Sequence, residues 1–213
     1  KEKVEDGELP PVDERLPEDP MVVEPIDEIG EYGGTWRNLE VKDYKYMNWE
    51  GFHKITNSTD LYPGYGAFET VPNVAKKTEH NEDYTKFTFH LRKGMKWSDG
   101  EEFNTDDLMF FFEDIIKNEE MTPAPPAQWT AGGEIVEASA PDKYTFVLEY
   151  AAPKPRLLPI LGEQWHDGPR IFKCPEHYLK QFHPDYADEE KLQKKVDEAG
   201  MDYWYQLLAA KSV

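Results

Sequence analysis

The sequence predicts a mixed α/β fold, of the α+β kind, in an acidic chain of 213 residues. Three observations lead to this fold class. Residues 87–92 alternate between apolar and polar side chains, as a half-buried strand does. Residues 108–116 repeat apolar side chains at helical spacing. Residues 134–150 divide at a turn into two strand-like runs, which predicts a hairpin.

The first thirty residues are predicted to form an extended arm. They contain eleven acidic residues, three basic residues, five prolines and no aromatic residue. Such a segment cannot bury enough apolar surface to fold alone, and its prolines favour an extended backbone. The arm either lies along the folded body through its apolar residues or is loose. Those apolar residues are Leu16, Met21, Val22, Val23 and Ile26.

Folded structure is expected to begin near residue 31. Gly33–Gly34 supplies a permissive turn, and residues 35–41 suit a first strand. Prolines and glycines then divide residues 57–75 into loops and one short strand. After the strand at 87–92, the pair Asp99–Gly100 is typical of a tight turn.

A helix is predicted to follow this turn. Asn104 or Thr105 would cap it, and Asp106 and Asp107 in its first turn are favourable against the helix dipole. Its apolar face would consist of Leu108, Phe111, Phe112, Ile115 and Ile116. Trp97 is expected to be structural and to fix the turn between strand and helix.

The remaining segments are predicted as a loop, a hairpin and two helices. Residues 121–133 read as a long irregular loop, and the hairpin after it would turn at Asp142–Lys143. Residues 188–200 predict a helix that Gly200 ends, and residues 202–212 predict another. The inward residues of the first of these helices would be Leu192, Val196 and Ala199.

Charge and cysteine content exclude some classes of function. The formal net charge of −19 repels phosphate backbones and anionic headgroups, so nucleic acid is not an expected partner. The single cysteine, Cys174, allows no intrachain disulfide, a feature shared by cytosolic proteins and many exported bacterial proteins.

The sequence predicts no metal, cofactor or catalytic residue. The six histidines do not form a spacing typical of a metal site, and no nucleophile elbow or phosphate-binding glycine loop is present. Chance pairs of carboxylates are expected among 43 acidic residues, so they do not indicate a glycosidase. Aromatic residues are more informative, because Trp129 and Trp165 lie in polar loops. Each indole either anchors its loop on its own domain or contacts a ligand.

Four segments together carry a resemblance to a known family. Residues 71–115, including "KGMKWSDGEEFNTDDL", look like the signature region of bacterial extracellular solute-binding proteins of family 5. Residues 32–37, 133–161 and 173–192 resemble further pieces of that family in order and spacing. Residues 174–176 depart from the usual aliphatic-proline-lysine sequence, and family members are longer.

The resemblance implies a fold and a division into domains. The chain would be an N-terminal fragment of a periplasmic-binding-protein type II-like lobe with an inserted β-rich subdomain. Residues 31–60 and 160–213 would form part of lobe I, and residues 61–159 the inserted subdomain. Residues 1–30 would remain the acidic arm.

The resemblance also implies a function. The protein would be the substrate-binding component of an ABC importer, capturing oligopeptides or oligosaccharides and delivering them to a membrane permease. It would act as a monomer in the periplasm or extracellular space, and any lipid anchor would lie upstream of Lys1. Two alternatives stay open: an exported glycoside or peptide hydrolase, and an extracellular adhesion or scaffold module.

Ligand-binding residues follow only as hypotheses, because the family's ligand contacts are spread over both lobes. Aromatic and polar side chains in loops are the candidates. The aromatic candidates are Trp49, Tyr65, Trp129 and Trp165, and the polar candidates are Asp167 and Arg170.

Overall fold

The structure is a computed structural model of the chain. It describes residues 2–22, 25, 27–30, 56–58, 70–162 and 174–212. The predicted mixed α/β class is confirmed: an antiparallel sheet and a set of helices share one hydrophobic core. In the described part of the chain, no helix is long and apolar enough to span a bilayer.

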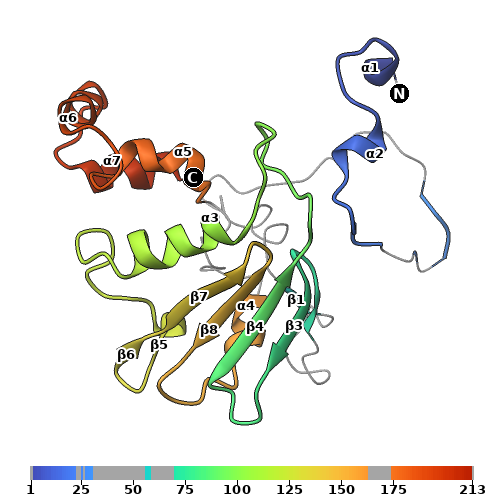
Figure 1. Ribbon diagram of the computed structural model, residues 1–213, viewed down its shortest axis with the longest axis horizontal. Helices are drawn as coiled ribbons and strands as arrows, with labels where there is room; N and C mark the ends of the chain where they lie inside the picture. Colours follow the sequence, from blue (N-terminus) through green and yellow to red (C-terminus); the bar gives the residue numbers. More distant parts are fainter. Residues whose placement is uncertain are drawn as a thin grey trace, which may run out of the picture.

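A four-stranded antiparallel sheet forms the centre of the fold (Figure 1). In spatial order the strands are β3 (Ala75–His80), β4 (Lys86–Leu91), β8 (Thr145–Glu149) and β7 (Glu137–Asp142). The alternation predicted for β4 is confirmed, because Phe87, Phe89 and Leu91 are buried on one face. Phe89 lies opposite Phe146 of β8, so the same face of both central strands contributes to the core.

Helix α3 (Thr105–Phe110) packs against the sheet and continues into a π-helical segment, η2 (Phe111–Ile116). The predicted cap is confirmed at Asn104, whose Oδ1 accepts a hydrogen bond from the Asp106 N–H at 2.7 Å. The π-helical turn was not predicted. The three consecutive phenylalanines, Phe110 to Phe112, are all buried, so this part of the helix is enclosed on more than one side.

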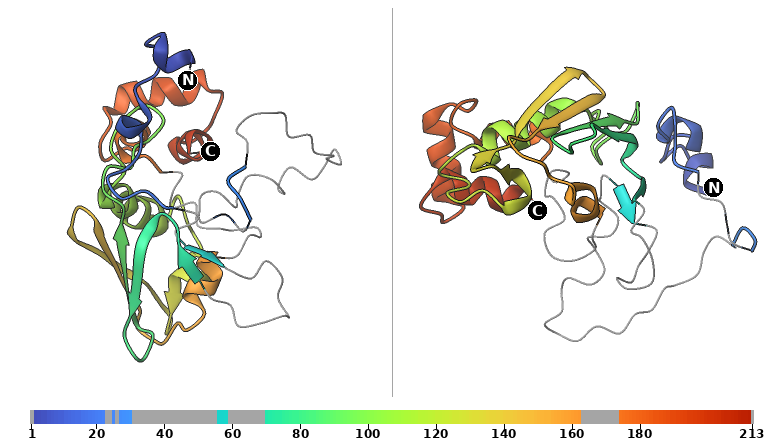
Figure 2. Two further views of the ribbon diagram at one scale, coloured as in Figure 1. Left: turned by 90° about the vertical axis from the view of Figure 1, so that its right-hand side faces the viewer. Right: turned by 90° about the horizontal axis from the view of Figure 1, so that it is seen from below.

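Three of the helices after the sheet, together with a 3₁₀ turn, lie beyond α3 in both Figure 1 and the left view of Figure 2: α5 (Glu176–Leu179), η5 (Lys180–Phe182), α6 (Glu189–Glu198) and α7 (Trp204–Lys211). Helix α4 (Leu157–Gly162) instead lies behind the sheet in Figure 1, beside β1 (Thr56–Ser58). The two helices predicted for residues 188–200 and 202–212 are confirmed as α6 and α7. Gly200 follows α6 at a φ of 67°, a left-handed conformation that glycine adopts without strain. Ala199 was predicted to point inward, but it is the exposed cap that follows the last helical turn.

Residues 121–133, predicted as an irregular loop, contain regular structure. A 3₁₀ turn η3 (Ala127–Trp129) leads into a small hairpin of β5 (Thr130–Ala131) and β6 (Glu134–Ile135). Gly132 and Gly133 form its turn at φ values of 64° and 85°. The hairpin between β7 and β8 turns at residues 143–144, one position later than predicted, because Asp142 still pairs with Thr145.

Two short strands and the N-terminal arm complete the described structure. Strand β1 (Thr56–Ser58) pairs with β2 (Thr70–Pro72). The arm contains two single helical turns, α1 (Glu2–Glu5) and α2 (Val12–Arg15), where the sequence predicted an extended backbone throughout. The predicted first strand at 35–41 lies outside the described residues.

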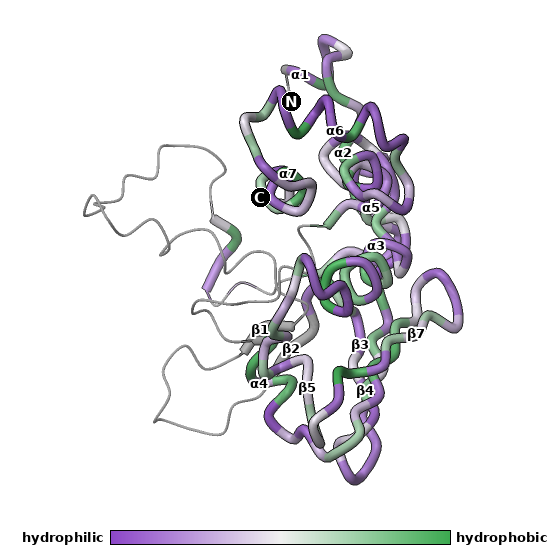
Figure 3. Tube along the Cα trace, turned by 90° about the vertical axis from the view of Figure 1, so that its left-hand side faces the viewer, coloured by the Kyte–Doolittle hydropathy of each residue, from purple (hydrophilic) through white to green (hydrophobic). Residues whose placement is uncertain are grey.

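The arm contacts the body through polar groups, which include an ion pair between the Asp19 carboxylate and Lys76 at 3.7 Å. The Glu18 N–H donates to the Lys93 carbonyl at 3.0 Å, and Arg92 Nη1 donates to the Asp19 carbonyl at 2.8 Å. The predicted apolar anchors Leu16, Met21 and Val22 are exposed, whereas Val23 and Ile26 lie outside the described residues. Figure 3 shows the arm as largely hydrophilic, in agreement with this mode of attachment.

Replacement of the cap residue Asn104 by alanine is expected to lower the free energy of unfolding by about 1 kcal/mol. The variant removes the acceptor that Asn104 presents to the first turn of α3. Urea denaturation followed by tryptophan fluorescence measures the change. Asn104→Ser keeps a side-chain acceptor and should stay within a few tenths of a kcal/mol of the parent chain. Equal stability of all three proteins would contradict the capping role.

Candidate functional site

The Trp97–Gly100 turn, which carries the family resemblance, is held in place by several hydrogen bonds. The Trp97 N–H donates to the Glu101 carbonyl at 2.8 Å, and the Gly100 N–H donates to the Trp97 carbonyl at 3.0 Å. Gly100 has a φ of 98°, which explains why glycine occupies this position. The Trp97 ring packs edge-on against Phe103, with 5.5 Å between centroids, and this confirms its predicted structural role.

Asp107 connects this turn to the C-terminal helices. Its Oδ2 accepts hydrogen bonds from the Asn104 N–H at 3.1 Å and from Trp97 Nε1 at 3.2 Å. Its Oδ1 accepts from the Glu176 N–H at 2.9 Å, at the start of α5. Asp107 is 3% exposed, and this burial raises the pKa of its carboxyl against the opposing effect of the N–H donors.

A second contact joins the same two segments near the surface. His177 Nε2 lies 2.8 Å from Asp99 Oδ2, and this hydrogen bond lowers the pKa of the Asp99 carboxyl. The buried Asp107 carboxylate and the exposed Asp99–His177 hydrogen bond therefore connect the turn to the starts of α3 and α5. These contacts give the turn a structural role, as was predicted from the sequence.

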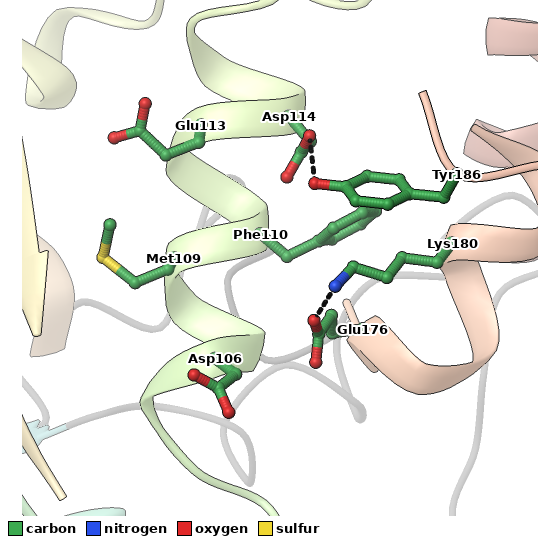
Figure 4. A pocket seen from close by; sticks show the side chains of 8 residues that line it. All are labelled: Asp106, Met109, Phe110, Glu113, Asp114, Glu176, Lys180 and Tyr186. Carbon is green, nitrogen blue, oxygen red and sulfur yellow. Dashed lines mark hydrogen bonds and ion pairs between the residues drawn. The ribbon is translucent and has the colours of Figure 1, made fainter. Parts of the chain in front are cut away.

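A pocket of about 230 Å³ lies between the α3–η2 helix and the segment that contains α5 and η5 (Figure 4). The helix contributes Asp106, Met109, Phe110, Glu113 and Asp114, and the other side contributes Glu176, Lys180 and Tyr186. Four of these residues are acidic and one is basic, so the wall of the pocket is strongly negative.

The polar groups of the pocket are partly paired with one another. Lys180 forms an ion pair with Glu176, and its ammonium lies 4.5 Å from the centroid of the Tyr186 ring. The Tyr186 hydroxyl donates to Asp114 Oδ1 at 2.9 Å, the contact drawn in Figure 4. Partial burial raises the pKa of the Asp114 carboxyl. Burial and the bond to Asp114 together raise the pKa of Tyr186 to about 12, so the hydroxyl stays protonated near neutral pH.

The lining of this pocket suits the binding of a positively charged group, because it provides four carboxylates and two aromatic rings. The Lys180 ammonium already lies over the face of the Tyr186 ring, as such a group would. None of the eight lining residues is a serine, cysteine or histidine, so the lining contains no nucleophile paired with a histidine base.

The structure describes one of the six candidate ligand-binding residues. Trp129 is 2% exposed and packs edge-on against Phe112, with 4.8 Å between ring centroids. This packing corresponds to the alternative in which the indole anchors its loop on its own domain. The predicted contact between Trp129 and a ligand stays a prediction. The other candidates, Trp49, Tyr65, Trp165, Asp167 and Arg170, lie outside the described residues.

Two features of this region were not predicted from the sequence. Asp107 was predicted only as part of the start of a helix, although the Asn-x-x-Asp spacing from Asn104 is the signal of a capping box. The contact between Asp114 and Tyr186 was not predicted, because the two residues are far apart in the chain.

Comparison with known proteins identifies relatives that align with most of the chain. Residues 69–200 match the family described as "Bacterial extracellular solute-binding proteins, family 5 Middle". The chain is 33% identical over 203 residues to a periplasmic alpha-galactoside-binding protein of Rhizobium meliloti strain 1021. That match covers 86% of this chain and 28% of the relative.

Two solved structures are similar to the chain over most of its length. One is the oligopeptide-binding protein OppA, with 35% identity, a TM-score of 0.79 and coverage of 97% of this chain and 31% of that protein. The other is the periplasmic binding protein MelB of Agrobacterium fabrum C58 in complex with stachyose. It shows 29% identity, a TM-score of 0.61 and coverage of 90% of this chain and 31% of that protein.

These comparisons confirm the fold that the sequence resemblance implied, because both structures are binding proteins of the predicted type. The chain spans about a third or less of the length of these relatives. The family match itself covers more than half of the chain, from Glu69 to Gly200. The chain belongs to the bacterial extracellular solute-binding proteins of family 5.

Proposed function

We propose that this chain is part of the substrate-binding component of an ABC importer. The full-length protein would capture an oligopeptide or oligosaccharide outside the cytoplasm and deliver it to a membrane permease, without changing the ligand chemically. The family match over residues 69–200 is the observation that carries this proposal. The chain would act as a monomer, and a lipid anchor, if present, would lie upstream of Lys1.

Relatives that align with most of this chain support two chemical classes of ligand. Two relatives have names that point to oligosaccharides. One is an alpha-galactoside-binding protein, and the other is a binding protein in complex with stachyose. The name of a third relative points to oligopeptides. Both classes combine hydrogen-bonding groups with faces that stack on aromatic rings, and both suit the tryptophan- and tyrosine-rich loops of this sequence.

The proposed mechanism is closure of two lobes around the ligand. A ligand that contacts both lobes favours the closed conformation over the open one, and the closed form would be presented to the permease. Residues 31–60 and 160–213 would belong to one lobe and residues 61–159 to its inserted subdomain. The network around Asp107 would hold the subdomain at a fixed orientation on that lobe.

The ligand contacts would come from loops at the boundary between the lobes. We place them first at Trp49, Tyr65 and Trp165, with Asp167 and Arg170 as polar partners. Trp129 would be a secondary candidate, because its indole is engaged in core packing.

Calorimetry of the full-length protein tests this function. Titration with a di- to pentapeptide pool and with stachyose is expected to give micromolar or tighter binding for one class, with the ligand recovered intact by chromatography. Cleaved ligand would support a hydrolase instead, and absence of binding to both classes would contradict the proposal. Residues 1–213 alone should bind at least about 100-fold more weakly, because closure on a ligand requires both lobes.

Single alanine replacements test the proposed contacts. Trp49→Ala, Tyr65→Ala and Trp165→Ala should each weaken ligand binding by about 10-fold or more, since a buried aromatic contact contributes more than about 1.4 kcal/mol. Tyr203→Ala is the matched control, because this tyrosine is 54% exposed next to α7. Unchanged affinity in all three variants would contradict these assignments.

A further inference from the structure

Three possible metal ligands lie close together beside the pocket. They are Asp114 of η2, His183 after η5, and Asp185 in the turn that leads to α6. One ligand atom from each residue lies within 4.8 Å of the other two. The spacing of the histidines predicted no metal site, but spacing along the sequence cannot reveal a group of ligands that two distant segments build.

The imidazole of His183 is held in one orientation. It is 1% exposed, and its ring packs against Trp204 with 4.7 Å between centroids and against Tyr186 with 5.5 Å. Its Nδ1 accepts a weak hydrogen bond from the Asp185 N–H at 3.2 Å and lies 3.8 Å from Asp185 Oδ2. Nδ1 therefore lies beside both the N–H and the carboxylate of Asp185, and an ion bound to Nδ1 would replace the hydrogen bond from this N–H. Nε2 lies 3.5 Å from the side-chain amide nitrogen of Asn118.

The two carboxylates differ in exposure, and this difference suits ion binding. Asp114 is half-buried, and the Tyr186 hydroxyl fixes one of its oxygens through the 2.9 Å hydrogen bond. Protein ligands to metals commonly have such a supporting hydrogen bond from an outer residue. The Asp185 side chain is 75% exposed and can rotate toward an ion that is held by the other two ligands.

The local charge also favours a divalent cation. Asp114 and Asp185 place two carboxylates beside the His183 imidazole. Lys180 is nearby, but it is paired with Glu176. A divalent ion would balance both carboxylates, and the adjoining pocket would supply water for the remaining coordination position.

We propose that His183 Nδ1, Asp114 and Asp185 bind a divalent transition-metal ion of the Zn²⁺ type. One nitrogen and two carboxylate oxygens are a ligand set that such ions accept. Tetrahedral coordination at bonds of about 2.1 Å places ligand atoms about 3.4 Å apart. The distances between the three ligand atoms, which are now 4.8 Å or less, must therefore shorten by about 1.5 Å or less. The ion would join η2 to the turn before α6 and so stabilise the contact between the helix on the sheet and the C-terminal helices.

Titration of the purified, metal-free chain with Zn²⁺ tests this site. We expect one ion per chain by calorimetry and a rise in melting temperature, since a ligand that binds only the folded state stabilises it. Asp185→Asn and Asp114→Asn should each weaken Zn²⁺ binding by about 10-fold or more, because each removes one ligand. The matched control Asp202→Asn changes an exposed aspartate before α7 and should alter the affinity less than twofold.

A second variant and a spectroscopic measurement complete the test. Tyr186→Phe keeps the ring but removes the hydrogen bond to Asp114, and it should weaken binding by about 10-fold. Chemical-shift mapping of the histidine side chains should show the largest change at His183. Failure to bind Zn²⁺, or binding that Asp114→Asn and Asp185→Asn leave unchanged, would overturn the proposal. Neither outcome decides the proposed solute-binding function, because the metal site shares no residue with the proposed ligand contacts.

Discussion

Replacement of Asp107 by alanine is expected to lower the free energy of unfolding by about 3 kcal/mol or more. The carboxylate is 3% exposed and accepts hydrogen bonds from the Asn104 N–H, Trp97 Nε1 and the Glu176 N–H. Alanine removes the acceptor and leaves three donors, each of which costs about 1 kcal/mol or more when water cannot reach it. Urea denaturation with tryptophan fluorescence at neutral pH measures the loss.

The neighbouring residue Asp106 provides the control for this experiment. It also lies in the first turn of α3, but it is exposed. Asp106→Ala should cost about 0.5 kcal/mol, since it removes only a favourable charge near the helix N-terminus. Similar losses in the two variants would show that Asp107 acts through the helix dipole alone and does not connect the turn to α5.

The pH dependence of stability tests the balance of forces on the same carboxyl. Burial raises the pKa of Asp107 in the folded state above its ordinary value of 3.8. The folded state then binds more protons than the unfolded state between these two pKa values. The resulting stabilisation is complete below pH 3.8 and is lost as the pH rises through the folded pKa.

Comparison with Asp107→Asn isolates this contribution from those of the other acidic residues. The stability advantage of the parent chain over Asp107→Asn should decrease as the pH rises from about 3.8. An advantage that increases with pH would mean that the three N–H donors outweigh burial, and that the folded pKa of Asp107 is lowered.

Local sequence patterns predicted the regular elements of the sheet and its helix well. The alternation of Phe87, Phe89 and Leu91 and the cap at Asn104 are short-range signals, and the structure confirms both. The hairpin of β5 and β6 was missed because two-residue strands are too short to show an alternating pattern. The π-helical turn was missed because its apolar positions also fit an α-helix.

The candidate sites were harder to predict, because distant segments build them. Asp107 meets Glu176 across 69 positions, and Asp114 meets Tyr186 across 72. A single sequence contains no signal for such pairings. The residue types alone gave the role of Trp97 correctly, but they left two roles open for Trp129.

The second large effect is expected for Trp129→Ala, with a loss of about 3–5 kcal/mol in the free energy of unfolding. The indole is 2% exposed and lies edge-on to Phe111 and Phe112, with centroids 5.9 Å and 4.8 Å away. Its removal leaves a cavity in the core beside Phe111 and Phe112, which surrounding side chains can fill only partly. Thermal and urea denaturation measure the change, and a loss below about 1 kcal/mol would contradict the core role.

Trp129→Phe separates the packing role from ligand contact. Phenylalanine keeps an aromatic ring in the cluster with Phe111 and Phe112, so it should recover more than half of the stability that alanine loses. If Trp129 serves only the core, the full-length protein with Trp129→Phe binds its ligand within twofold of the parent. If the indole also contacts the ligand, the affinity falls about 10-fold or more while stability stays near that of the parent. The first result would restrict Trp129 to the core, and the second would support its secondary place among the proposed ligand contacts.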